Sequence, residues 1–316
     1  MKTVLVTGHA GFIGSHLTAK LLKKSFKVIG VDNFNAYYDP KRKEKNVKEF
    51  KKNRNFKEYK VDITDFEKLK KVFKENKIDL IVHLAARAGV RPSIKNPELY
   101  KKVNVKGTEN LLKIAKEFKI NQFVYASSSS VYGEQEKIPF SETDPVKNQV
   151  SPYAKTKKQA EELCLKYAKE YGIKMTVLRF FTVYGPAGRP DMAPYIFTRK
   201  MLKNETITKF GEGDSSRDYT YIDDIVQGII KAIEKPFEFE IINLGNNQPV
   251  KLNDFIKTLE RLIDKKAKII EKPRHVADVK RTYADISKAK KLLDWEPEID
   301  LETGMKKFID WFKNSA

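Results

Sequence analysis

The chain has 316 residues, of which 41% are hydrophobic and 33% charged, with a formal net charge of +20 at pH 7. That length suffices for two domains or one large α/β unit, and no apolar run approaches the roughly 18 residues of a membrane span, so we expect a cytoplasmic protein with no membrane partner. The single cysteine excludes an intrachain disulfide, and the sequence has no zinc-ligand spacing, so we expect no metal site. The lysines lie along helix faces and form no nucleic-acid-binding pattern, so we expect no nucleic-acid partner.

The first predicted unit is a strand, a glycine turn and a helix. Residues 3–7 are an apolar β-type run, three glycines follow at intervals of three, and a helical pattern continues through Leu17 and Leu21. Glycines let the backbone turn sharply and approach a pyrophosphate, which binds at the helix N-terminus. This context predicts dinucleotide binding by Gly8, Gly11, Phe12, Ile13 and Gly14.

The next two strands end in carboxylates. Asp32 directly follows the strand at 27–31 and lies 18 residues after Gly14. At that position a carboxylate binds an adenosine ribose and repels a 2′-phosphate. NAD is therefore favoured over NADP. After a lysine-rich insertion at 39–55, the strand at 56–61 ends at a position that faces the adenine edge. The cofactor contacts predicted here are Asp32, Asn33, Asp62 and Ile63.

Small residues follow the fourth strand, 80–84, where they let a cofactor lie close. A helical pattern runs from 97 to 118. Because strands alternate with helices at every step, the sequence predicts an α/β fold with a parallel, doubly wound sheet. The predicted cofactor contacts in this stretch are Leu84, Ala85, Ala86, Arg87 and Asn104.

A hydroxyl-rich strand end and a tyrosine-bearing helix come next. The strand at 122–125 leads into four serines, 127–130, which we interpret as hydrogen-bond donors beside a ligand. Ser151 caps a helix that ends at Gly172. On that helix Tyr153 and Lys157 are four residues apart and share one face. An ammonium beside a phenol lowers the phenol pKa, which makes the tyrosine a usable base.

The remaining sequence predicts a second, smaller domain. Glycines and prolines at 185–192 mark the departure from the first domain, and strand and helix patterns alternate to the end of the chain. We expect a cofactor domain of residues 1–177, to which about 212–240 returns. The smaller, interleaved C-terminal α/β substrate domain then comprises 178–211 and 241–316. A second buried side on the 151–172 helix suggests a homodimer.

The glycine motif, the serines and Tyr153-x-x-x-Lys157, in this order, resemble the extended short-chain dehydrogenase/reductase superfamily, with its Rossmann sheet, and within it the nucleotide-sugar epimerases. Relatives that dehydrate sugars have Asp-Glu where Ser129 and Ser130 stand. Residues 179–192 are similar to the UDP-glucuronate 4-epimerases, whereas galactose 4-epimerases have asparagine in place of Thr182. Ala187 and Arg87 depart from the glucuronate pattern, which often has a large aromatic and a glutamine there.

The resemblance implies a tightly bound, recycled NAD and a transient 4-keto sugar. Tyr153 is then the base, Lys157 holds the phenolate and the nicotinamide ribose, and Ser128 bonds the sugar 4-oxygen. The implied substrate contacts are Ser129, Ser130, Phe181, Thr182, Arg189, Arg217, Arg274 and Asp278. The predicted reaction converts UDP-glucuronate to UDP-galacturonate. The alternatives are a UDP-glucose or UDP-N-acetylglucosamine 4-epimerase, a sugar-decarboxylating relative, and a non-catalytic NAD- or nucleic-acid-binding protein.

Overall fold

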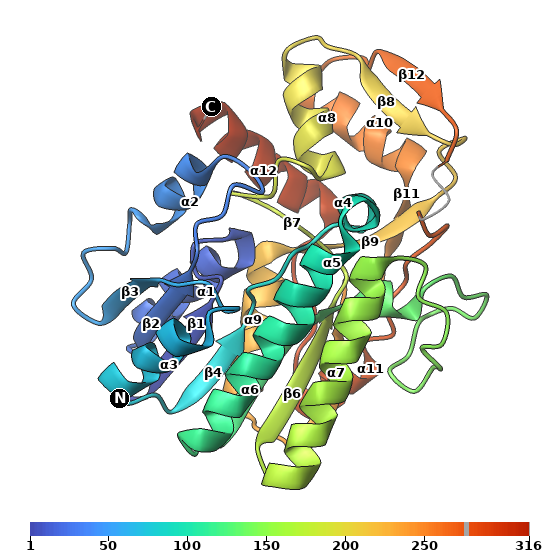
Figure 1. Cartoon of the computed structure of the whole chain (residues 1–316). Helices are drawn as coiled ribbons and strands as arrows, with labels where there is room; N and C mark the ends of the chain where they lie inside the picture. The colour runs from blue at the N-terminus through green and yellow to red at the C-terminus, as the bar shows by residue number, and fades with distance from the viewer. Residues whose placement is uncertain (275–277, 316) are drawn as a thin grey trace.

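A seven-stranded parallel sheet forms the centre of the protein, as a computed structural model that describes residues 1–274 and 278–315 shows (Figure 1). The strand order is β10-β6-β5-β4-β1-β2-β3. The strands are β1 (Thr3–Thr7), β2 (Lys27–Asp32), β3 (Phe56–Lys60), β4 (Leu80–His83), β5 (Gln122–Ser128), β6 (Lys174–Phe180) and β10 (Phe239–Leu244). The chain winds outward from β1 to β3 and then returns through β4. The predicted doubly wound sheet is confirmed, and ligands bind such sheets where the winding reverses.

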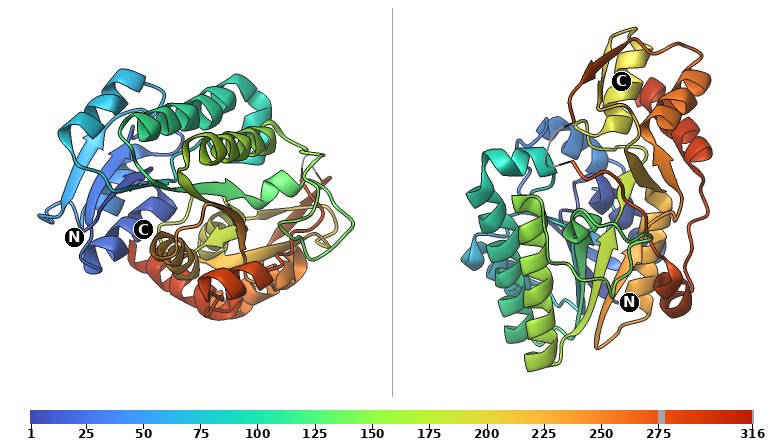
Figure 2. Two further views of the ribbon diagram at one scale, coloured as in Figure 1. Left: turned by 90° about the horizontal axis from the view of Figure 1, so that it is seen from below. Right: turned by 90° about the vertical axis from the view of Figure 1, so that its right-hand side faces the viewer.

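Helices cover both faces of this sheet, and Figure 2 (left) shows the three layers end-on. One face carries α3 (Phe66–Glu75), α6 (Gly107–Glu117) and α7 (Pro152–Tyr171); the other carries α1 (Phe12–Lys23), α9 (Ile222–Glu234) and α11 (Ser287–Leu293). The apolar strands are buried on both sides, since Val4 and Val6 pack into one core and Leu5 into the other. No helix in the described ranges is both long and apolar enough to cross a membrane.

The predicted helix at 97–118 is interrupted. It consists of α5 (Pro97–Tyr100), a π-helical segment (Lys101–Lys106) and α6, and α4 (Val90–Lys95) precedes it. Such π segments occur often at functional sites. The lysine-rich insertion forms α2 (Pro40–Val47), which packs against α1.

A smaller unit lies beyond the carboxyl ends of the large sheet (Figure 1; Figure 2, right). It contains a three-stranded sheet, a two-stranded sheet and three helices: β7 (Thr182–Tyr184), β9 (Ser216–Tyr221), β11 (Pro249–Lys251), β8 (Ile207–Phe210), β12 (Ile269–Lys272), α8 (Ala193–Leu202), α10 (Leu252–Ile263) and α12 (Leu301–Ser315). The division into domains stays a proposal. We extend the returning segment to Leu244, because β10 pairs with β6 in the large sheet.

Candidate active site

One cavity of about 880 Å³ lies between the large sheet and the smaller unit. Its wall brings together residues that are far apart in the sequence. Of the predicted site residues, those that line it are Gly8, Gly11, Phe12, Ile13, Gly14, Asp32, Asn33, Asp62, Ile63, Leu84, Ala85, Ala86, Arg87, Ser128, Ser129, Ser130, Tyr153, Lys157, Phe181, Thr182, Arg189, Arg217, Arg274 and Asp278. Their individual roles stay predictions.

The glycine turn forms a close-packed cradle at one end of the cavity. Gly8 has φ +74°, and a Cβ there would lie 2.9 Å from the Ala85 nitrogen. A Cβ on Gly14 would collide with the Gly8 carbonyl oxygen. No side chain among the described residues caps the N-terminus of α1 at Gly11, which leaves its first amide groups for an anion. This cradle fits a dinucleotide pyrophosphate.

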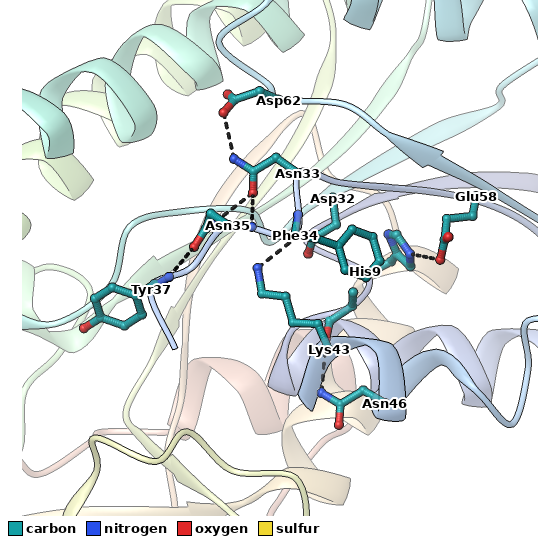
Figure 3. Close-up of polar contacts among 11 residues, drawn as sticks. His9, Asp32, Asn33, Phe34, Asn35, Tyr37, Lys43, Asn46, Glu58 and Asp62 are labelled. Atoms are coloured by element: carbon teal, nitrogen blue, oxygen red, sulfur yellow. Dashed lines mark hydrogen bonds and ion pairs between the residues drawn. The ribbon is translucent and has the colours of Figure 1, made fainter. Parts of the chain in front are cut away.

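A buried lysine pairs with the carboxylate at the end of β2 (Figure 3). Asp32 Oδ1 accepts hydrogen bonds from the Phe34 amide at 2.7 Å and from Lys43 Nζ at 3.1 Å. Because Lys43 offsets the charge of Asp32, Asp32 repels a 2′-phosphate less strongly than the sequence alone predicts. Sequence reasoning missed Lys43 within the lysine-rich insertion. Its spacing of four from Val47, the other buried residue of α2, was the available signal.

Asn33 and Asp62 hold each other at the ends of β2 and β3. Asn33 Nδ2 donates to Asp62 Oδ2 at 2.7 Å (Figure 3), and the Thr64 amide and hydroxyl donate to Asp62 Oδ1. Burial raises the pKa of Asp62, but these hydrogen bonds outweigh it and hold that pKa below its usual range. The two predicted adenosine contacts therefore form one rigid unit.

Tyr153 and Lys157 project from the first turns of α7, which Ser151 caps by accepting from the Ala154 amide. Lys157 Nζ donates to the Ala126 carbonyl at 2.7 Å, and burial lowers its pKa to about 8. Burial raises the pKa of Tyr153, which the Ser128 hydroxyl and Arg189 only partly oppose. The expected lowering of this pKa by Lys157 is therefore wrong in this structure: desolvation dominates, and the Lys157 ammonium is bonded to a carbonyl.

The serines at and after the end of β5 form part of the cavity wall. The Ser128 hydroxyl donates to Ser130 Oγ at 3.1 Å and accepts from the Ser130 amide at 3.2 Å. Asn104, in contrast, lies behind the wall that the structure describes. Its side chain bonds the backbone N–H and carbonyl of Arg87, at 2.7 and 3.0 Å, and donates to Thr156 Oγ1. Any effect on a cofactor is thus exerted through the Arg87 loop.

A contact between two loops spans the cavity. Arg189 forms a bidentate pair with Asp191, at 3.0 and 2.6 Å, and the Tyr37 hydroxyl donates to the same carboxylate at 3.0 Å. Tyr37 follows β2, whereas Arg189 and Asp191 follow β7. Sequence reasoning named Arg189 but missed its two partners, since 154 residues separate Tyr37 from Asp191.

The far end of the cavity carries several cations. Arg217 and Arg274 line it, as does Arg91, which sequence reasoning missed. The Arg91 guanidinium donates to Asp278 at 2.5 and 3.4 Å and lies 4.1 Å from the centre of the Phe210 ring. Asp278, one of the substrate contacts that the resemblance implies, is thus already engaged by an arginine. This concentration of guanidinium groups suits an anionic ligand.

Comparisons with known proteins agree with this geometry. Residues 4–245 match the model of the NAD dependent epimerase/dehydratase family. A UDP-glucuronate 4-epimerase of Thermodesulfobacterium geofontis is 50% identical over 98% of this chain and 96% of its own length. The Bacillus cereus UDP-glucuronic acid 4-epimerase, solved in complex with UDP-glucuronic acid and NAD, is 37% identical with a TM-score of 0.94, over 99% of this chain and all of its own. A Thermotoga maritima UDP-glucose 4-epimerase, solved with UDP-glucose, is 34% identical with a TM-score of 0.92, over 99% of both chains. The chain therefore belongs to the NAD dependent epimerase/dehydratase family.

Proposed function

We propose that this protein is an NAD-dependent 4-epimerase that converts UDP-glucuronate to UDP-galacturonate. The observation that carries this proposal is the meeting of Ser128, Tyr153 and Lys157 with a glycine cradle in one cavity. The choice of sugar is supported by the relative that is 50% identical, against 34% for the structure named for UDP-glucose. A binding module has no use for an acid–base tyrosine beside a buried lysine, which disfavours the non-catalytic alternative.

The cradle fits NAD, with the pyrophosphate at Gly8, Gly11 and Gly14 and the adenosine ribose at Asp32. Within the described residues, both hydrogen bonds to Asp32 end on Oδ1, so Oδ2 can accept from a ribose hydroxyl. When bound, the nicotinamide supplies a hydride acceptor that returns what it takes. The net reaction is redox-neutral, so the cofactor stays in place between turnovers.

The chain's own contribution is proton transfer at the sugar 4-oxygen. Tyr153, as phenolate, accepts the proton of the 4-hydroxyl and later returns it. The Ser128 hydroxyl and the Arg189 guanidinium both favour this phenolate, since each lowers the pKa of Tyr153 against the effect of burial. Lys157, a buried cation one helical turn away, adds positive charge to the site where the Tyr153 phenolate forms.

A 4-keto glucuronate is a β-keto acid and loses carbon dioxide if its carboxylate turns perpendicular to the carbonyl. The cavity offers hydroxyl donors that can hold it in another orientation, namely Thr182 at the start of β7 with Ser129 and Ser130 at the end of β5. Arg217 and Arg274 would face the diphosphate, and Arg189, fixed by Asp191, would gate the sugar end.

We propose that the protein works in the cytoplasm as a homodimer that pairs through α7. Near the C-terminal end of α7 the rings of Tyr167 and Tyr171 are 5.1 Å apart, and Tyr171 is 41% exposed. Light scattering tests the proposal: a mass near twice 36.5 kDa is expected, and a monomer would contradict it.

The test of function is incubation of the purified protein with UDP-glucuronate, UDP-glucose or UDP-N-acetylglucosamine without added NAD. UDP-galacturonate should form from the first. A UDP-pentose would indicate decarboxylation, and turnover of the neutral sugars alone would favour the alternative epimerase. Tyr153→Phe should keep its NAD and lose turnover; a near-normal rate would rule out Tyr153 as the base.

A further inference from the structure

A buried ion pair lies beneath the end of β5. Glu161 on α7 and Arg179 on β6 are each 2% exposed. Arg179 donates from Nε to Glu161 Oε1 at 2.9 Å and from Nη2 to Oε2 at 2.8 Å. Neither residue belongs to the part of the cavity wall that the structure describes. A role for this pair must therefore act through the residues that it touches.

Stability alone gives no reason to keep this pair. A buried ion pair stabilises a fold no better than well-packed apolar side chains do, because desolvation offsets the attraction. Here Arg179 also buries Nη1 without a hydrogen-bond partner among the described residues, which adds a further penalty. The pair is more easily explained by what its carboxylate holds.

That carboxylate has a third partner in the strand end itself. The Ser127 hydroxyl donates to Glu161 Oε1 at 2.5 Å. Ser127 lies between Ala126, whose carbonyl accepts the Lys157 ammonium, and Ser128, which lines the cavity. Glu161 therefore holds the middle one of three consecutive residues, of which Ala126 binds Lys157 and Ser128 is itself a proposed catalytic group.

Glu161 also acts on Lys157 directly, from one turn further along the same buried face of α7. Burial lowers the pKa of Lys157 to about 8, and Glu161 is the strongest influence in the opposite direction, followed by Cys164. The other titratable groups around this ammonium are Tyr153 on α7, Tyr125 on β5, whose ring centre is 5.0 Å away, and His83 on β4. On β6, the Arg179 guanidinium is bonded to Glu161 and opposes part of its influence on Lys157.

We propose that Glu161 is a positioning residue of the active site, which fixes the Ala126–Ser128 strand end through Ser127 and keeps the neighbouring Lys157 charged. The inference rests on the proposed function for its kinetic consequence. Its structural part, the control of Lys157 by Glu161, holds for any substrate.

The variant Glu161→Gln keeps the shape of the side chain and removes its charge. Glu162→Gln is the matched control, because the Glu162 carboxylate is 59% exposed and pairs with Lys158. For Glu161→Gln, the alkaline limb of the kcat/KM profile should move to lower pH by about one unit. At pH 8 kcat should fall about fivefold with KM changed less than about twofold. Glu162→Gln should reproduce the wild-type profile.

A second readout does not depend on turnover. With lysine labelled at ¹³Cε, the Lys157 resonance, assigned by its loss in Lys157→Met, should titrate near pH 8 in the wild type and about one unit lower in Glu161→Gln. If the wild type turns over no UDP-sugar, the proposed function fails, and this titration still decides the inference. An unchanged titration, or an unshifted alkaline limb, overturns it.

Glu161→Gln leaves the Arg179 charge buried without its partner, which lowers the stability of the variant. Glu161→Gln/Arg179→Met removes both charges together and should move both readouts in the same direction but by less, because loss of the Arg179 cation offsets part of the loss of the Glu161 carboxylate. Ser127→Ala removes the hydrogen bond that links Glu161 to the strand and leaves the Glu161 charge in place, so it should lower kcat without moving the alkaline limb. A double variant with the wild-type profile would overturn the inference.

Discussion

The pair of Asp32 and Lys43 gives the sharpest test of how the cofactor end of the cavity is built (Figure 3). The side chains of both residues are almost completely buried, at 5% and 6% exposed, and their charged atoms are 3.1 Å apart. Substitution of Lys43 by methionine keeps the volume and removes the charge. Asp32 then keeps its hydrogen bond from the Phe34 amide and loses its only cationic partner within the described residues.

The expected loss follows from that geometry. At 3.1 Å the attraction is about 5 kcal/mol at an effective dielectric constant of about 20. Removal of one partner of a buried pair costs about 3–5 kcal/mol, because the other charge stays buried. The retained amide bond places Lys43→Met near the lower end, at about 3 kcal/mol. For 316 residues, an unfolding entropy of about 0.7 kcal/mol per K converts this into a fall in Tm of about 4–5 °C.

Urea unfolding and thermal melts measure this loss, and the NAD released on denaturation reports the cofactor site. Lys48→Met is the control, since Lys48 is exposed on the same segment and pairs with no carboxylate among the described residues; it should change stability by less than about 0.5 kcal/mol. Asp32→Asn/Lys43→Met should recover most of the stability but not the NAD content. A loss in Lys43→Met no larger than in Lys48→Met would refute the reasoning.

Three further predictions follow from the same structure. Gly14→Ala should lower co-purifying NAD at least about tenfold, measured by absorbance after denaturation, because its Cβ would collide with the Gly8 carbonyl oxygen. His83, bonded by Thr7 and Thr108 and buried so that its pKa falls to about 3, should destabilise the fold in acid. The unfolded histidine gains a proton below about pH 6.5 and the folded one does not, so the loss of stability between pH 7 and 5 should be about 2 kcal/mol smaller in His83→Asn by urea titration. Asp191→Asn should lower kcat/KM about tenfold or more in initial-rate assays, because it removes the carboxylate that holds Arg189 and Tyr37.

Local patterns predicted the fold and most of the cavity wall. The spacing of Gly8, Gly11 and Gly14 after a strand and the alternation of strands with helices are short-range signals, and the sheet follows from them. The Ser151 cap likewise fixes the start of α7 and with it the face that carries Tyr153 and Lys157. The carboxyl ends of neighbouring parallel strands then meet at one edge, which brings these residues together.

Partners across long separations were not predictable. Arg91 and Asp278 are 187 residues apart, and no local pattern links them. The prediction of a lowered pKa for Tyr153 failed for a related reason. The spacing of Tyr153 from Lys157 was right, but burial decides the direction of the pKa shift, and burial depends on the smaller unit that closes the cavity. Spacing along a helix identifies which groups are neighbours, whereas the sign of a pKa shift depends on what surrounds them in three dimensions.

The proposed reaction explains why the segment after β2 is tied to the smaller unit. Tyr37 donates to Asp191, and Arg42 donates to the Tyr195 hydroxyl at 2.7 Å, so two hydrogen bonds join this segment to the residues that follow β7. In a dehydrogenase that exchanges its cofactor each cycle, such contacts would slow every turnover, because they would have to open. An epimerase recovers its hydride within one cycle and has no need to release the cofactor. Contacts that would slow an enzyme that exchanges its cofactor therefore serve here only to retain the cofactor.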